Sequence, residues 1–155
     1  MIISKALRRV VHAGIAAMMF VWLGAGFAAE PDPKSLTYTL PENIKWIDNA
    51  SGSRVWNVIG DPSKPEMYVV VQIWTKGHMS RPHSHPNDRY ITVLKGTWWV
   101  GTGPKYDPAS TFPMKAGTVV KHLGKGIHYD GAKDEDAWLQ IVGMGPATST
   151  NAEQK

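Results

Sequence analysis

The sequence contains no cysteine among its 155 residues. This absence excludes a disulfide scaffold, a thiolate zinc site, a cysteine nucleophile and a lipid-modified cysteine. A metal site in this chain must therefore use nitrogen and oxygen ligands.

Helical periodicity, internal repeats and low-complexity tracts are also missing after the N-terminal segment. Residues 36–143 instead consist of short runs rich in Val, Ile, Thr, Tyr and Trp, divided by Gly, Pro, Asn and Asp. With 43% hydrophobic and 19% charged residues, the chain can bury one core. The sequence predicts one all-β domain, a sandwich or barrel, with strands at residues 44–47, 54–59, 67–75, 90–94, 97–100, 117–122 and 137–143.

Residues 1–29 differ in composition from the rest of the chain. Lys5, Arg8 and Arg9 precede an uncharged stretch that ends in small residues, a pattern typical of a bacterial signal peptide. An uncleaved membrane anchor is the alternative, because the stretch is nearly long enough to span a bilayer, although His12 and three glycines weaken it. We expect a periplasmic or secreted protein with a lead-in at residues 30–39, a folded domain at 40–145 and a flexible tail at 146–155.

Little net charge remains once this leader is removed. The formal charge of the whole chain is +4, and the leader carries three basic residues and no acid, so that about +1 remains. The other basic residues are interleaved with acids and form no stripe that could follow a phosphate backbone. We expect no nucleic-acid partner and, after cleavage, no membrane contact.

Histidines supply the first indication of chemistry. His83 and His85 are two residues apart, so on an extended strand both imidazoles point to the same face. His128 follows 43 residues later, a separation that antiparallel strands readily bring together. Three imidazoles suit a first-row divalent ion and leave coordination positions open. We expect iron, with nickel, copper, manganese or zinc as the alternatives.

These histidines lie in a pattern that resembles the two motifs of the cupin superfamily. Four of five marked positions of the first motif match, namely Gly77, His83, His85 and Gly96. The second motif matches at two positions and departs at three where Pro, Gly and Asn are usual, namely Gly117 and His128 against Leu123, Lys125 and Ala132. The resemblance covers roughly residues 40–145. It implies a double-stranded β-helix, the jelly-roll or cupin barrel, with a metal site inside its mouth.

Arg89 stands where the cupin motif usually places a ligating Glu. A guanidinium cannot coordinate a metal, so any ion is held by the three histidines alone. Arg89 is four residues after His85, so on an extended strand both side chains face the cavity. There Arg89 would bind a carboxylate, enolate or peroxide and serve substrate binding and catalysis. The alternative is a structural ion pair with Asp88, Asp130 or another acid, or a place on the rim.

Other residues are weaker candidates. Tyr129 and Asp130 are a candidate proton-handling pair, although an Asp-Gly after a strand is alternatively a simple turn. Trp74 and Trp98 are candidate substrate-binding walls or ordinary core, and of the adjacent Trp98 and Trp99 one must face outward. His78 is a candidate fourth ligand or a surface residue. His122 lies either beside the metal ligands or on the outer face of the sheet. Tyr106 and Asp107 belong to a loop that could gate the cavity.

Two functional hypotheses follow from this resemblance. The first is an exported, metal-dependent enzyme acting on a small organic molecule by dioxygenase-like or other Lewis-acid chemistry. The second is a non-enzymatic module that binds a small molecule or a metal, since one fold serves both roles. Exposed sheet edges need cover, so we also expect a homodimer.

Overall fold

The computed structural model describes residues 29–154, so the predicted signal peptide lies outside the described residues except for its last position. The chain divides into two units, residues 1–38 and 39–155. Within the first unit, the described residues form a turn in which the amides of Ser35 and Leu36 donate to the carbonyl oxygen of Asp32. Between residues 29 and 154, no helix is long and apolar enough to cross a membrane.

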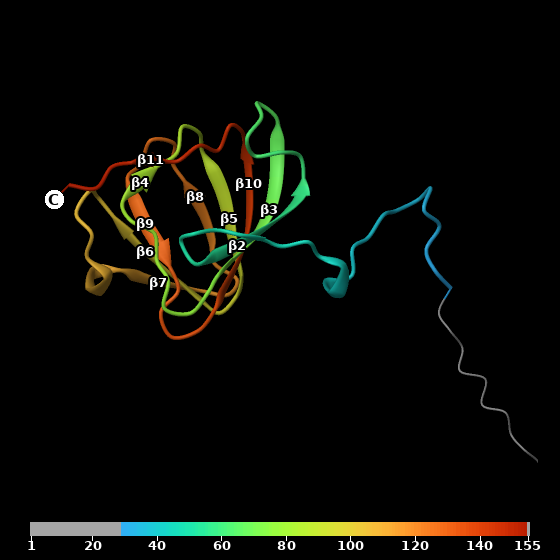
Figure 1. The fold of residues 1–155 in the computed structure, drawn as a ribbon, viewed down its shortest axis with the longest axis horizontal. Coiled ribbons are helices and arrows are strands. Elements are labelled where there is room, and N and C mark those ends of the chain that lie inside the picture. The colour runs from blue at the N-terminus through green and yellow to red at the C-terminus, as the bar shows by residue number, and fades with distance from the viewer. Residues whose placement is uncertain (1–28, 155) are drawn as a thin grey trace, which may run out of the picture. The chain divides into compact units, whose positions relative to one another are not determined.

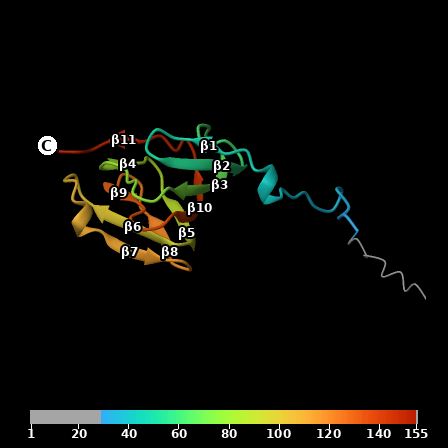
Figure 2. The same cartoon turned by 60° about the horizontal axis from the view of Figure 1, so that its bottom comes forward.

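The second unit consists of two antiparallel sheets (Figures 1 and 2). One has the strand order β1-β2-β3-β10-β5-β8 and the other β11-β4-β9-β6-β7. The strands are β1 (Ile47–Asp48), β2 (Ser53–Ile59), β3 (Met67–Trp74), β4 (His83–Ser84), β5 (Arg89–Lys95), β6 (Thr97–Thr102), β7 (Phe112–Lys115), β8 (Val119–His122), β9 (His128–Gly131), β10 (Ala137–Met144) and β11 (Thr150–Asn151). Two short 3₁₀ helices, η1 (Pro41–Asn43) and η2 (Pro108–Ser110), complete the described elements.

Alternating side chains of the long strands build the core. In β10 every second residue up to Gly143 is buried, because odd-numbered positions face the interior of the two-sheet structure. The same alternation buries Ile91 and Val93 of β5, and it buries Trp98 while leaving its neighbour Trp99 partly exposed. The expectation that these two tryptophans face opposite ways is confirmed.

Strands that are distant in sequence become neighbours in this winding. β10 lies between β3 and β5, and β9 lies between β4 and β6. The second arrangement places His83 of β4 directly opposite His128 of β9 in the antiparallel register. The fold thus joins two segments of the chain that each carry a candidate metal ligand.

The predicted strand boundaries need several corrections. The strand predicted at 44–47 is a two-residue strand, β1, preceded by η1. The expected gating loop with Tyr106 and Asp107 leads directly into η2 and β7. Strand β9 was missed because all four of its residues are buried, so no polar alternation marks it, and its Asp130-Gly131 pair is strand rather than turn. The segment expected as a flexible tail contributes β11, which pairs with β4.

Candidate metal centre

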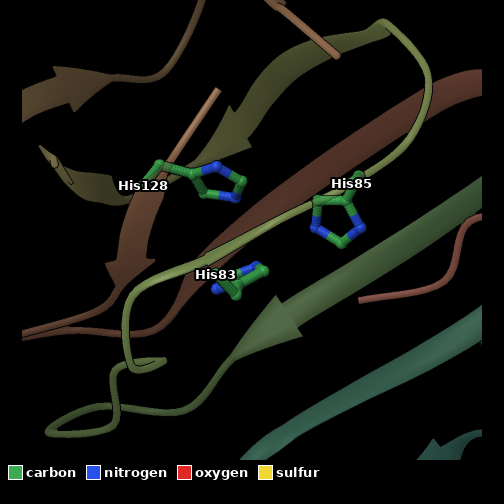
Figure 3. A group of neighbouring side chains, drawn as sticks. All are labelled: His83, His85 and His128. Carbon is green, nitrogen blue, oxygen red and sulfur yellow. The ribbon is translucent and has the colours of Figure 1, made fainter. Parts of the chain in front are cut away.

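Three histidine side chains converge between β4 and β9 (Figure 3). His83 and His128 are register partners, and His85 follows β4 in the chain. One ligand nitrogen from each ring lies within 4.8 Å of the other two, and the ring centroids of His83 and His128 are 4.3 Å apart. The convergence expected from the sequence is therefore present in the fold.

Backbone carbonyls orient all three imidazoles. The Nδ1 atoms of His83, His85 and His128 lie 2.8, 3.0 and 3.0 Å from the carbonyl oxygens of Arg81, Thr148 and Gly126. A carbonyl oxygen can only accept, so each Nδ1 carries the proton and each Nε2 keeps its lone pair. This arrangement is the one that fixes histidine ligands in metal sites.

Two of these imidazoles, His85 and His128, are held neutral. Burial, followed by the positive charge of Arg89, lowers the pKa of His85 to about 3. Burial also lowers the pKa of His128 to about 4, although the carboxylate of Asp130 opposes this shift. Both rings therefore keep a free lone pair at neutral pH, as a metal ligand must.

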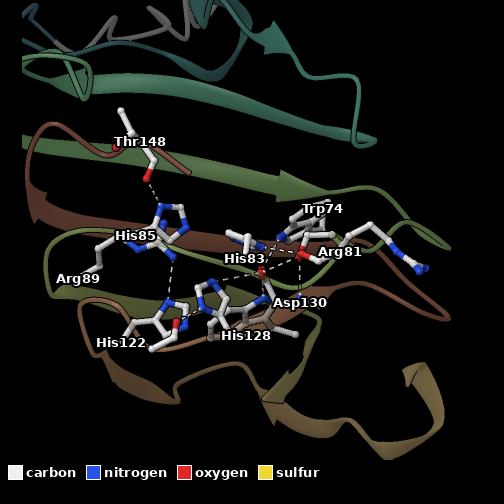
Figure 4. Close-up of polar contacts among 12 residues, drawn as sticks. Trp74, Arg81, His83, His85, Arg89, His122, His128, Asp130 and Thr148 are labelled. Atoms are coloured by element: carbon white, nitrogen blue, oxygen red, sulfur yellow. Dashed lines mark hydrogen bonds and ion pairs between the residues drawn. The ribbon is translucent and has the colours of Figure 1, made fainter. Parts of the chain in front are cut away.

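Asp130 lies next to these histidines but its oxygens are already engaged (Figure 4). The indole Nε1 atoms of Trp74 and Trp98 both donate to Oδ2, at 2.9 and 2.8 Å, and the Ser80 hydroxyl donates to Oδ1 at 3.2 Å. Burial opposes ionisation of Asp130, but His128, His83 and the Trp98 hydrogen bond together hold the pKa of its carboxyl below the usual value. Asp130 is thus a buried carboxylate that fixes two indole rings.

Tyr129 does not share this environment, so the structure does not bring Tyr129 and Asp130 together as the expected pair. Neighbouring residues of an extended strand point to opposite faces, and Asp130 lines the cavity. The Tyr129 hydroxyl donates to the carbonyl oxygen of Asp107 at 2.9 Å, and its ring lies against Tyr106 and the backbone of Gly101. Tyr129 therefore anchors the loop between β6 and β7 and holds no position beside the histidines.

Arg89 points inward and meets a histidine that the sequence left undecided. Arg89 and His122 are register partners across β5 and β8, and Arg89 Nη2 lies 2.9 Å from His122 Nδ1. Since a guanidinium only donates, Nδ1 of His122 accepts and its proton sits on Nε2. Within residues 29–154, Arg89 forms no salt bridge, which argues against the structural ion pair considered above.

A cavity of about 590 Å³ opens beside these groups. His83, His85, Arg89 and Asp130 line it, together with both predicted tryptophan walls, Trp74 and Trp98. Its apolar lining includes Val55, Ile91, Leu139 and Ile141, and its polar lining includes Asn49, Ser51, Gln72 and Asn151. The cavity thus combines a few charged groups with an apolar wall, as small-molecule sites do.

Two expected candidates lie elsewhere, and one contributor was not foreseen. His78 is exposed and its Nδ1 contacts the Lys76 carbonyl oxygen at 3.1 Å, outside the histidine group. Tyr106 lies under the guanidinium of Arg81, with 3.8 Å between that group and the ring centroid. The C-terminal segment supplies the Thr148 carbonyl and cavity-lining side chains, which no residue type in the sequence could signal because the key group is backbone.

The residues present fit a divalent first-row metal ion. They provide three imidazoles whose Nδ1 atoms are all bound to backbone carbonyls, and Nε2 of His128 is buried without a hydrogen-bond partner in the described part of the chain. An unpartnered buried lone pair is costly, and a bound cation would satisfy it. Imidazole ligands are compatible with iron, nickel, copper, manganese and zinc, so the donor set alone does not select among them.

Scans against protein-family models and curated proteins find no match to this chain. Solved structures do share its architecture. The polyketide cyclase RemF from Streptomyces resistomycificus superimposes with a TM-score of 0.61 at 13% identity, over 77% of this chain and 87% of that one. An RmlC-like cupin from Shewanella frigidimarina gives a TM-score of 0.55 at 15% identity, over 70% of this chain and 90% of that one. A protein from Klebsiella pneumoniae with a double-stranded β-helix domain gives a TM-score of 0.55 at 19% identity, over 76% of this chain and 97% of that one. The chain therefore has the cupin fold, the double-stranded β-helix that its histidine motif implies.

Proposed function

We propose that this protein is an exported metal-dependent cupin enzyme that holds a divalent cation on His83, His85 and His128 and acts on a small organic molecule. The observation that carries the proposal is the convergence of three imidazoles, each with Nδ1 bound to a carbonyl and Nε2 free. RemF, which shares the fold, is by its name a cyclase, so this architecture does support catalysis.

The chemistry depends on what three neutral ligands leave available. A divalent cation held by them keeps its full charge and supplies Lewis acidity, and iron in particular supplies dioxygenase-like chemistry. The protein itself contributes a cavity with an apolar wall that displaces water, and it contributes the Arg89 guanidinium beside the ligands. Charged groups act more strongly on a substrate when water is excluded in this way.

A second candidate function, a non-enzymatic binding module, is favoured by one specific observation. Asp130 and Tyr129 were the expected proton-transfer groups, yet the first has its oxygens occupied and the second faces away from the cavity. With both groups already hydrogen-bonded elsewhere, the site matches capture of a small molecule or metal as well as its conversion. Turnover of bound compounds, measured on the metal-loaded protein, decides between the two.

Metal analysis tests the proposed site directly. The purified protein is expected to bind about one equivalent of divalent metal per chain, and His83→Ala and His128→Ala are each expected to abolish this binding. His78→Ala is the matched control, because His78 is an exposed histidine outside the group and its loss should leave the metal content unchanged. Equal metal content in all four proteins would overturn the proposal.

Export is the remaining part of the proposal and rests on the composition of residues 1–29. We expect the mature chain in the periplasm or the medium. N-terminal sequencing of the protein recovered from that fraction should show a cut near Ala28 or Ala29. An intact N-terminus on a membrane-bound protein would support the anchor instead.

A further inference from the structure

Arg89 places a positive charge in the cavity that the described residues do not neutralise. Its guanidinium is partly buried, and burial lowers its pKa against the opposing attraction of Asp130 and Tyr68. No carboxylate among residues 29–154 lies within salt-bridge distance of it, and its hydrogen-bond partner His122 is an uncharged ring. A partly buried cation is costly when it contacts only uncharged rings and has no paired acid. The Arg89 guanidinium therefore lacks a counter-ion.

The nearest acid cannot complete it. Asp130 accepts hydrogen bonds from Trp74 and Trp98 on one oxygen and from Ser80 on the other. Breaking these bonds to reach Arg89 would leave two indole N–H groups buried without partners. The Asp130 carboxylate therefore remains hydrogen-bonded to the two tryptophans. The part of the cavity next to Arg89 keeps a positive charge.

His122 fixes the position of this positive charge. Nδ1 of His122 accepts from one N–H group of Arg89, and His122 itself packs against His128 with 3.6 Å between ring centroids. A guanidinium carries five N–H donors, so those not directed at His122 or Tyr68 are available to a ligand. His122 is thus a positioning residue that aims Arg89 into the cavity.

We infer that the cavity binds a small organic monocarboxylate, with its carboxylate on Arg89 beside the three histidines and its apolar body against the wall formed by Ile91, Leu139 and Ile141. Arginine pairs with carboxylate through two parallel hydrogen bonds, which sets both position and orientation. This inference deepens the proposed function, since it names the substrate class of the same site. A cation on the histidines and an anion on Arg89 would also attract each other, so the two bind cooperatively.

Calorimetric titration of the full folded chain with benzoate and with the isosteric neutral benzamide tests the inference. The two probes share one apolar body and differ in charge. In metal-free protein we expect benzoate to bind at least tenfold more tightly than benzamide, and Arg89→Gln to remove that preference. Arg89→Lys keeps the charge and should retain part of it. Lys121→Gln is the matched control, because Lys121 is an exposed cation on the same strand as His122.

A second titration, of Co²⁺ with and without benzoate, separates the inference from the proposed function. We expect benzoate to tighten Co²⁺ binding in the wild type but not in Arg89→Gln. If Co²⁺ fails to bind while the Arg89-dependent preference for benzoate persists, the inference stands and the metal proposal fails. If benzoate and benzamide bind equally, or if the preference survives in folded Arg89→Gln protein, the inference is overturned whatever the metal does.

Discussion

The backbone carbonyl of Thr148 accepts a hydrogen bond of 3.0 Å from Nδ1 of His85, a residue 63 positions earlier in the chain. Nearby, Arg81 forms a salt bridge with Glu153, and the Arg81 carbonyl oxygen accepts from Nδ1 of His83. The C-terminal segment is consequently part of the metal centre, because it orients one ligand directly and contacts the residue that orients another.

Removal of residues 147–155 should weaken metal binding. The deletion eliminates the carbonyl that fixes the His85 tautomer, and loss of such a partner typically costs about 10–100-fold in metal affinity. Competition titration with a chromogenic chelator measures this change, and far-UV circular dichroism checks that the protein remains folded. Deletion of residues 154–155 alone is the control. A folded 1–146 chain with wild-type affinity would contradict this role of Thr148.

Replacement of Asp130 by Ala should destabilise the fold. The change leaves the indole N–H groups of Trp74 and Trp98 buried without an acceptor, and hydrogen bonds to charged groups contribute about 1.5–3 kcal/mol each. Urea unfolding should show a lower free energy by at least about 3 kcal/mol, with Asp130→Asn losing less because one oxygen remains. An unchanged unfolding midpoint in Asp130→Ala would show that these bonds contribute nothing.

Tyr129→Phe should leave metal binding unchanged. The Tyr129 hydroxyl donates to the Asp107 carbonyl oxygen, so the substitution removes one hydrogen bond and is expected to cost about 0.5–1.5 kcal/mol in stability. Metal affinity and unfolding of the same preparation provide both readouts. A large loss of metal affinity without a loss of stability would show that Tyr129 contributes to the metal site.

The metal-free protein should lose stability as the pH falls below about 6.5, the ordinary pKa of a histidine in an unfolded chain. In the folded state the pKa of His85 is about 3 and that of His128 about 4, so the unfolded chain binds more protons in this window. Each ring that stays neutral in the folded state adds up to about 1.4 kcal/mol per pH unit to the decline in the free energy of unfolding. Urea unfolding at pH 7, 6 and 5 measures it, and His85→Gln should show a shallower decline. Equal slopes in the two proteins would contradict the neutral state of His85.

The sequence predicts the fold class and the metal ligands because both leave local signals. Alternating apolar residues mark the long strands, and the spacing of His83, His85 and His128 survives as a motif. Arg89 lines the cavity as expected, but not through strand parity from His85, because the chain bends at residues 86–87 and β4 and β5 belong to different sheets. The strand predictions needed only the period of an extended chain, whereas the ligand set also needed the motif resemblance.

The remaining features depend on contacts that no local pattern records. The Asp130 carboxylate accepts hydrogen bonds from two tryptophans, one on β3 and one on β6. These hydrogen bonds exist only after the sheets form. The carbonyls that orient the histidines are backbone groups, identical in every residue type. The side of β9 on which Tyr129 lies could not be read either, because β9 itself carries no alternating pattern.

X-ray absorption spectroscopy of the zinc-loaded protein tests the central claim most directly, because it counts the ligands and identifies the ring scattering of imidazole. We expect three imidazole nitrogens at about 2.0–2.1 Å from the zinc ion, and no such signal in His128→Ala protein, which should not retain zinc. A wild-type spectrum with oxygen neighbours alone, or with fewer than three imidazoles, would contradict a metal centre built from His83, His85 and His128.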